Sequence, residues 1–172
     1  MHDDPILVLD TASPVVSVAI GCDGRIVAQR TLELRRSSEM LLQAVDEALD
    51  EAGVTRVELG AVAASRGPGS FTGLRIGLAT AIGLHQALGL PATGLDGRRL
   101  LARAAAEAFS SGRMAADPEA ADSAAVVAVD ALRGEWSSQR FRLGPAPEAL
   151  ERAQLRSGDE LLALDLPIVG FG

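Results

Sequence analysis

Apolar residues follow one another in three short runs at the start of the chain, over residues 6–10, 15–20 and 26–32. Short runs that are rich in Val and Ile are typical of β-strands. Asp23-Gly24 separates the second run from the third, and this dipeptide favours a two-residue hairpin turn. The pattern therefore predicts three strands at the N-terminus, joined by tight turns.

After the third run, apolar residues recur three and four positions apart, which is the spacing of an amphipathic helix. Residues 38–52 follow this pattern, with Ser37 placed as an N-cap and Gly53 as a C-terminal stop. The pattern then predicts a strand at 58–65, a helix at 70–88, a strand at 91–96 and a helix at 98–109. Hairpins followed by alternating strands and helices indicate a mixed sheet with helices on its faces.

A polar, acidic stretch that contains Pro and Gly divides the chain at residues 110–123. We predict that it is a linker between an N-terminal lobe at 1–109 and a short, partial C-terminal lobe at 124–172. The second lobe should contain two strands within 124–143, one or two short helices within 147–166 and a strand at 167–172. Two lobes that each open with a hairpin predict an α/β protein of the actin-like, ribonuclease-H-like (ASKHA) fold.

The composition is that of a globular protein with few groups for catalysis. Hydrophobic residues make up 48% of the 172 residues and charged residues 23%, and the net charge is −7. This acidic balance predicts weak binding of tRNA by the isolated chain. Lysine is absent, which excludes a P-loop lysine and a Schiff base. Only His2, His85 and Cys22 are available as histidine or cysteine ligands, so we expect no metal site.

The N-terminus is acidic and its apolar run is short, which is unlike a signal peptide. No segment approaches the ~20 apolar residues of a membrane-spanning helix. A lone cysteine suits a reducing compartment. We therefore expect a cytoplasmic protein.

The densest stretch of the chain is "GPGSFTGLRIG", residues 67–77. A glycine-rich turn before a helix is typical of phosphate binding, but the P-loop lysine and the G-x-G-x-x-G spacing are missing, and Pro68 has no amide donor. Ser70 lacks the flanking glycines of a G-x-S-x-G nucleophile, and His85 lies about 22 Å further along the same helix at 1.5 Å per residue. We favour a structural interpretation, in which the turn reverses the chain and Ser70 caps the helix.

The predicted helix at 70–88 is apolar almost all the way round. Its small residues are Gly73, Gly77 and Ala81 on one side, and its large residues are Leu74, Leu78 and Ile82 on the adjacent side. A helix that is apolar on two sides is buried on both. We predict that the small side packs on the sheet and that the large side, together with the helix at 38–52, meets a partner. The predicted interface residues are Met40, Leu41, Val45, Leu74, Leu78 and Ile82.

Several segments together resemble the TsaB (YeaZ) family, the glycoprotease-like paralogues of TsaD. They are "ILVLDTASPVVSVAI", which contains the pair Asp10-Thr11, the segment "SSEMLLQAVDEAL", and the glycine-rich run. The run is the family's most specific signature, and it is met here by Gly67, Pro68, Gly69, Ser70, Phe71, Thr72, Gly73, Arg75 and Gly77. The resemblance returns weakly at "VDALRGEW", where Leu132 interrupts the family's Asp-Ala-Arg-x-Gly-Glu spacing.

The resemblance implies a role in making N6-threonylcarbamoyladenosine (t6A) at position 37 of tRNA. It implies a non-catalytic dimerisation scaffold without cofactor or metal. This scaffold would pair with a TsaD-like catalytic subunit and a TsaE-like ATPase, and it would reach tRNA only through that complex. Alone, it would form a homodimer. Two departures stand out. Ser37 replaces a histidine that many members carry, and members usually continue well beyond a Gly-x-Gly such as Gly170-Phe171-Gly172.

Two other functions stay open on the sequence. A small actin-like ATPase or sugar-kinase-like phosphotransferase would use ATP and Mg²⁺, with Asp10, Thr11 and Asp130 as nucleotide-binding residues at the two hairpins. The structural alternative is that both carboxylates end strands and accept hydrogen bonds from turn amides. An M22-type peptidase is the remoter alternative, because no nucleophile has a base within reach.

Overall fold

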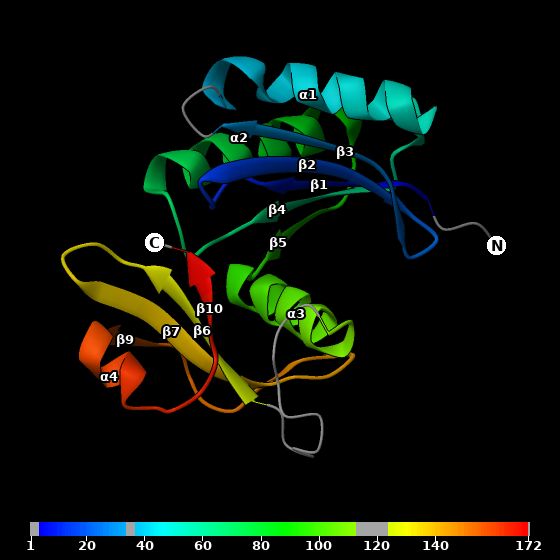
Figure 1. Ribbon diagram of the computed structural model, residues 1–172. Coiled ribbons are helices and arrows are strands. Elements are labelled where there is room, and N and C mark those ends of the chain that lie inside the picture. The colour runs from blue at the N-terminus through cyan, green and yellow to red at the C-terminus, as the bar shows by residue number, and fades with distance from the viewer. Residues whose placement is uncertain (1–3, 34–36, 113–123, 172) are drawn as a thin grey trace. The chain divides into compact units, whose positions relative to one another are not determined.

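The computed structural model describes residues 4–33, 37–112 and 124–171 (Figure 1). It divides into two compact units, Met1–Leu95 and Asp96–Gly172, and we describe each separately. Part of the predicted linker, residues 113–123, lies outside the described residues, as does Gly172. Among the described helices, none has the length and apolar character that crossing a membrane requires.

The first unit is built on a mixed five-stranded sheet, as the hydrophobic pattern predicted. Its strands are β1 (Ile6–Asp10), β2 (Val15–Cys22), β3 (Arg25–Glu33), β4 (Ala61–Ser65) and β5 (Ala92–Leu95), in the order β3-β2-β1-β4-β5. The hairpin strands pair antiparallel, whereas β4 pairs parallel with β1 and β5. Asp23 and Gly24 both have positive φ, as the predicted two-residue hairpin turn requires.

Two helices cover one face of this sheet, α1 (Ser37–Ala52) and α2 (Phe71–Leu88), and a short 3-10 turn, η2 (Arg56–Glu58), precedes β4 (Figure 1). Alternate residues of β1, among them Leu7 and Leu9, point at the helices and are fully buried. They join residues of both helices in a single hydrophobic cluster. Gly53 follows α1 with positive φ, which confirms the predicted stop. The predicted cap, the Ser37 side chain, lies outside the described part.

The second unit contains a second five-stranded sheet. Its elements are α3 (Gly97–Ser110), β6 (Ala124–Asp130), β7 (Glu135–Arg142), β8 (Glu148–Ala149), β9 (Gln154–Ser157), α4 (Gly158–Leu162) and β10 (Ile168–Phe171). The order is β10-β6-β7-β8, with β9 also paired to β7. Strand β6 is apolar from Ala124 to Val129, where both of its faces are covered, and ends in the exposed Asp130. Val127 packs with Ala102 of α3, and Val126 packs with Leu161 of α4.

The second unit differs from the sequence prediction in two places. Helix α3 belongs to it rather than to the first unit, because Ala102 packs on Val127 and Phe141 of the second sheet, so the boundary lies after Leu95 and not after residue 109. The short helix predicted within 147–166 is present as α4, but the same stretch also forms the strands β8 and β9, which were not predicted. The residues of β9 pair with β7, and this tertiary pairing overrides their local helical preference.

Candidate functional site

The glycine-rich run connects β4 to α2 and holds the first turn of that helix. Gly67 and Gly69 have φ of 92° and 149°, which residues with a side chain rarely adopt. Ser70 is the N-cap of α2, because its hydroxyl accepts a hydrogen bond from the Gly73 amide at 3.1 Å. The predicted capping role of Ser70 is therefore confirmed.

The same run is seated on the turn between β1 and β2. The Ser70 amide donates to the Ala12 carbonyl at 2.8 Å. A Cβ on Gly69 would lie 2.2 Å from that carbonyl oxygen, and a Cβ on Gly77 would lie 2.1 Å from the Thr11 hydroxyl. Only glycine fits at either position, so the motif spacing reflects close packing of α2 against this turn.

Three amides of this loop are engaged within the first unit. The Gly67 amide donates to the Ser65 hydroxyl at 3.4 Å, and the Gly73 and Ser70 amides are engaged as described above. Pro68 has no amide hydrogen. The contacts of the loop within its own unit therefore favour the structural interpretation over a phosphate cradle.

Of the three residues considered for nucleotide binding, the two aspartates bond their own turns and the threonine is buried. Asp10 accepts a hydrogen bond from the Ala12 amide at 3.1 Å, and Asp130 accepts one from the Leu132 amide at 2.7 Å. Thr11 is fully buried, and its hydroxyl has no hydrogen-bond partner. Asp130 belongs to the second unit, so the three do not form one site within either unit. Both carboxylates thus take the turn-bonding role of the structural alternative.

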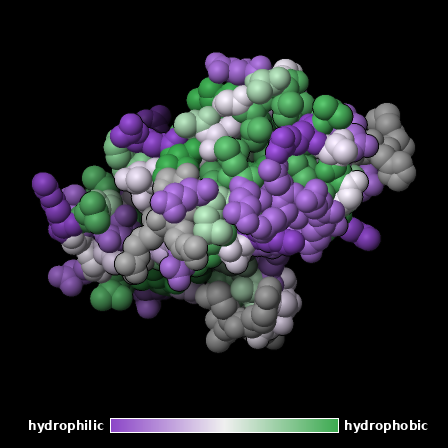
Figure 2. Space-filling model, turned by 90° about the horizontal axis from the view of Figure 1, so that it is seen from above, coloured by the Kyte–Doolittle hydropathy of each residue, from purple (hydrophilic) through white to green (hydrophobic). Residues whose placement is uncertain are grey.

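Helix α2 turns its small residues inward. Gly73, Gly77 and Ala81 are buried against the sheet, as predicted. Its outward surface carries Phe71, which is 74% exposed, and Ile82, which is 52% exposed. Figure 2 looks onto the side that carries α1 and α2 and shows hydrophobic residues at the surface beside hydrophilic ones. Exposed large apolar side chains on one helix face are typical of an interaction surface.

A hollow of about 320 Å³ lies on this outward surface. It is lined by Thr72, Arg75, Ile76 and Ala79, which stand at positions i, i+3, i+4 and i+7 of the helix. Four residues with this spacing form the hole that receives a single side chain from a facing helix in knobs-into-holes packing. We call the outward surface formed by Phe71, Thr72, Arg75, Ile76, Ala79 and Ile82 the docking face. Ile76 is partly buried, because it lines the hollow and also packs against the core cluster. The geometry of the docking face suits an apolar side chain of another helix.

The docking face differs from the predicted interface in its members. Leu41 and Val45 are each only 2% exposed, because this stripe of α1 packs on its own sheet. Leu78 also packs against the core cluster, and Met40 and Leu74 are partly buried. Ile82 alone of the six is exposed. Phe71 and Leu42, the exposed leucine of α1, were not among the predicted interface residues, although the helical spacing puts Leu42 off the buried stripe.

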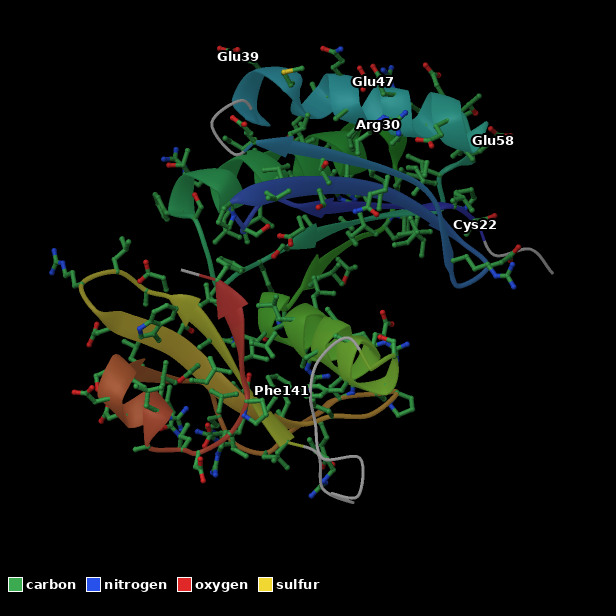
Figure 3. All side chains as sticks on the ribbon, in the orientation of Figure 1. Cys22, Arg30, Glu39, Glu47, Glu58 and Phe141 are labelled. Atoms are coloured by element: carbon green, nitrogen blue, oxygen red, sulfur yellow. The ribbon has the colours of Figure 1, made fainter. Side chains whose placement is uncertain are left out.

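The outer side of α1 is acidic. Glu39 and Glu47 project along it, with Arg30 of β3 beside Glu47 (Figure 3). Arg30 pairs with Glu47 at 3.7 Å and also with Glu51. Arg56 of η2 donates a hydrogen bond to Asp46 of α1, and this bond and the charge of Asp46 raise the pKa of Arg56. The acidic side of α1 and the arginine of the docking face therefore present opposite charges to a partner.

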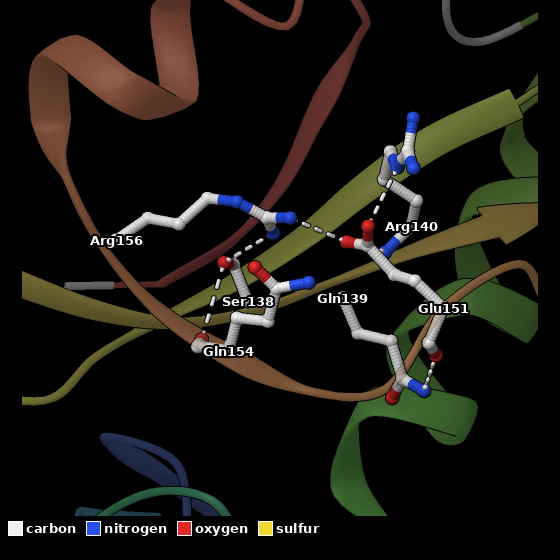
Figure 4. Close-up of polar contacts among 6 residues, drawn as sticks. All are labelled: Ser138, Gln139, Arg140, Glu151, Gln154 and Arg156. Carbon is white, nitrogen blue, oxygen red and sulfur yellow. Dashed lines mark hydrogen bonds and ion pairs between the residues drawn. The ribbon is translucent and has the colours of Figure 1, made fainter.

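The second unit contains a cluster of charged groups around Glu151 (Figure 4). Its carboxylate accepts hydrogen bonds from Arg156 at 2.7 Å and from Arg140 at 2.9 Å, and Arg156 also donates to the Ser138 hydroxyl. The cluster ties the segment before β9 to β7. Among the described residues, no group of three His, Cys, Asp or Glu side chains is placed to hold a metal ion.

Comparisons with known proteins all find similarity to proteins of tRNA threonylcarbamoyladenosine biosynthesis. The family model of TsaD, tRNA N6-adenosine threonylcarbamoyltransferase, matches residues 27–144. The chain is 35% identical over 168 residues to the tRNA threonylcarbamoyladenosine biosynthesis protein TsaB of Escherichia coli, covering 90% of this chain and 68% of that protein. The TsaB protein of Haemophilus influenzae is 35% identical over 107 residues, which are 62% of this chain and 45% of that one.

Solved structures give the same result. YeaZ from Pseudomonas aeruginosa superimposes with a TM-score of 0.72 at 27% identity, covering 91% of this chain and 68% of that one. The predicted fold class is thereby confirmed. The chain spans about two thirds of the length of the E. coli protein and of the P. aeruginosa structure, and less than half of the H. influenzae protein.

Proposed function

Because the chain belongs to the TsaB family, we propose that it works in the biosynthesis of tRNA threonylcarbamoyladenosine as a docking subunit rather than as an enzyme. Its partner in this proposal is a TsaD-like catalytic subunit. A TsaE-like ATPase joins the pair, tRNA is bound only by the assembled complex in the cytoplasm, and the isolated chain forms a homodimer.

The docking face of α2 is the observation that carries the proposal. It combines exposed apolar side chains with a hollow, and the residues that line this hollow have the spacing of a hole in knobs-into-holes packing. Two facing helices of each partner can supply the roughly 800 Å² per side that a stable interface needs. The acidic side of α1 adds a charge pattern that a partner with basic side chains would complement.

The contacts of the family motif support a structural role over a catalytic one. Ser70 is engaged as a helix cap, and its amide is held by Ala12. His85 stands in the last turn of the same helix, where its ring contacts the Leu90 carbonyl. A serine nucleophile needs a base within hydrogen-bond reach, and this histidine is at the opposite end of the helix.

Complementation tests the proposal. In a strain depleted of its own TsaB, expression of this chain should restore the t6A content of tRNA, measured by mass spectrometry of nucleosides. Affinity capture of the chain should recover the TsaD-like protein of the same organism in a stoichiometric complex. Failure of the purified pair to associate at micromolar concentrations would overturn the docking role. Threonylcarbamoyl transfer to tRNA by this chain alone would overturn its non-catalytic character.

A further inference from the structure

We propose that the turn after β1 is the seat that sets the position of α2, which makes Thr11 and Gly77 positioning residues for the docking face. The seat itself is independent of the proposed function. Its consequence for partner binding rests on that function.

The first contact of the seat is a hydrogen bond that fixes the start of the helix. The Ser70 amide donates to the Ala12 carbonyl at 2.8 Å, and Ala12 is itself buried. The Asp10 carboxylate accepts a hydrogen bond from the Ala12 amide at 3.1 Å, so the turn is held from both sides. The N-cap of α2 is thereby tied to the end of the central strand β1.

The second contact lies two turns along the helix and fixes its distance from the sheet. The α-carbon of Gly77 rests on the Thr11 side chain so closely that a Cβ there would lie 2.1 Å from the hydroxyl oxygen and 3.1 Å from the Thr11 Cβ and Cγ2. Thr11 is fully buried, and its hydroxyl makes no hydrogen bond. Shape rather than polarity therefore determines this contact.

Two contacts at different points along one helix determine both the rotation of the helix about its axis and its distance from the sheet. Each residue of an α-helix advances 1.5 Å and turns 100°. A small displacement of α2 therefore moves the hollow between Thr72 and Ala79 relative to α1, and a partner that contacts both helices loses complementarity. Interiors are close-packed, so an added methyl group at Gly77 displaces the helix instead of being absorbed.

The seat also explains why a turn that would face phosphate in an actin-like ATPase carries Ala12-Ser13-Pro14. The Ala12 carbonyl is covered by Ser70, and Gly69 packs directly on it. The carbonyl side of this turn is therefore covered from within the first unit.

A double-mutant cycle on the full chain tests the inference. Gly77→Ala should lower Tm, raise hydrogen exchange at the α2 amides, and weaken the affinity for the TsaD-like partner about tenfold. Thr11→Ala removes the hydroxyl and Cγ2 of residue 11. In the double variant, the methyl group introduced at position 77 then keeps only the 3.1 Å contact with the Cβ of residue 11. The double variant should therefore recover most of the wild-type Tm, exchange and affinity. Gly158→Ala in helix α4 of the second unit, where a Cβ would meet nothing within 4 Å, is the control for a Gly→Ala change away from the docking face and should change affinity less than about twofold.

The possible outcomes separate the two claims. If Thr11→Ala fails to restore Gly77→Ala, or if Gly77→Ala alone behaves like wild type, the seat is refuted. If the cycle shows coupling in Tm and exchange while affinity, corrected for the folded fraction, is unchanged, positioning of the docking face is refuted. If the wild-type chain binds no partner at all, the proposed function fails, and the coupling in Tm and exchange still decides the seat.

Discussion

The guanidinium of Arg75 lies 5.7 Å from the centroid of the Phe71 ring, one helical turn apart on the outward surface of α2. A cation over an aromatic face is held by the ring quadrupole. The pair therefore presents an aromatic edge and a positive charge in a restrained arrangement beside the hollow at Ala79. Aromatic and arginine side chains are the types that most often dominate protein interfaces.

Ile82→Glu should abolish association while leaving the chain folded. Ile82 is 52% exposed, so the new carboxylate stays in water in the isolated chain, and the stability should change by no more than about 0.5 kcal/mol. In a complex the charge would be buried without a partner, which is costly. Light scattering and thermal melts measure the two effects. Leu155→Glu, on an exposed leucine of β9, makes the same type of change away from the docking face and should leave association intact. Equal loss in both variants would contradict the assignment.

Leu78→Glu should act on the fold instead of the interface. Leu78 packs against the core cluster beneath α2, so a carboxylate there loses its water and disrupts the packing. We expect a loss of about 2 kcal/mol or more in the free energy of unfolding. Urea denaturation followed by circular dichroism measures it. A variant that keeps wild-type stability and fails only to associate would show that Leu78 faces the partner.

Glu151→Gln should destabilise the second unit by about 3 kcal/mol, because it leaves two arginines without their shared carboxylate. The side chains of Glu151 and Arg156 are only 11% and 10% exposed. The control is Glu148→Gln. It breaks the ion pair with Arg142, but both side chains are largely exposed, so about 0.5 kcal/mol is expected. Denaturant melts of both variants give the difference, and similar losses would show that burial of the cluster contributes nothing.

The same carboxylate predicts a pH dependence. Burial raises the pKa of Glu151, but hydrogen bonds from Arg156 and Arg140 outweigh burial, and the pKa lies below its ordinary value. A carboxylate with a lowered pKa stabilises the fold above the unfolded-state value, about 4.3 for Glu, and this contribution is lost as pH falls through the folded-state value. The stability gap between wild type and Glu151→Gln should therefore be constant from pH 7 to about pH 5 and narrow below pH 4.3. A gap that widens on acidification would contradict this assignment.

The elements of the first unit could be predicted from the sequence because local signals and packing agree there. Asp23-Gly24 adopts the turn that its residue types favour, and Gly53 ends α1 as expected. The inward small side of α2 was also predictable, since small residues at helical spacing, such as Gly73 and Gly77, indicate the side that packs closely on the sheet. The second unit was less predictable. Residues 154–157 form a strand only because β7 offers them a hydrogen-bonded edge.

The docking face was harder to predict, because helical periodicity says which residues share a side but not which side meets the sheet. On α1 the richer apolar stripe, with Leu41 and Val45, covers the core, and the exposed Leu42 stands off it. The close contact of Thr11 with Gly77 joins positions far apart in the chain. Only the three-dimensional packing of α2 against β1 brings these two residues together.

Leu132 shows how one departure from the family motif can be tested. It lies in the hairpin between β6 and β7 with φ of 71°, followed by Arg133 at 59° and Gly134 at 80°. A side chain in the left-handed region costs roughly 1–2 kcal/mol, and only glycine, asparagine and aspartate adopt it readily. The Leu132 side chain is 70% exposed, so it gains little from packing in return.

Leu132→Asn should therefore raise the stability of the protein by about 1 kcal/mol, or Tm by about 3 °C. The backbone contacts that hold the turn, from the Leu132 amide to Asp130 and from the Glu135 amide to the Leu132 carbonyl, do not involve the side chain and are kept. Leu162→Asn is the matched control, because Leu162 is equally exposed but lies in helix α4 without positive φ, and it should bring no gain. Thermal melts of the two variants compare them directly. If both raise Tm equally, the gain comes from removing an exposed leucine, and the left-handed backbone at position 132 carries no cost.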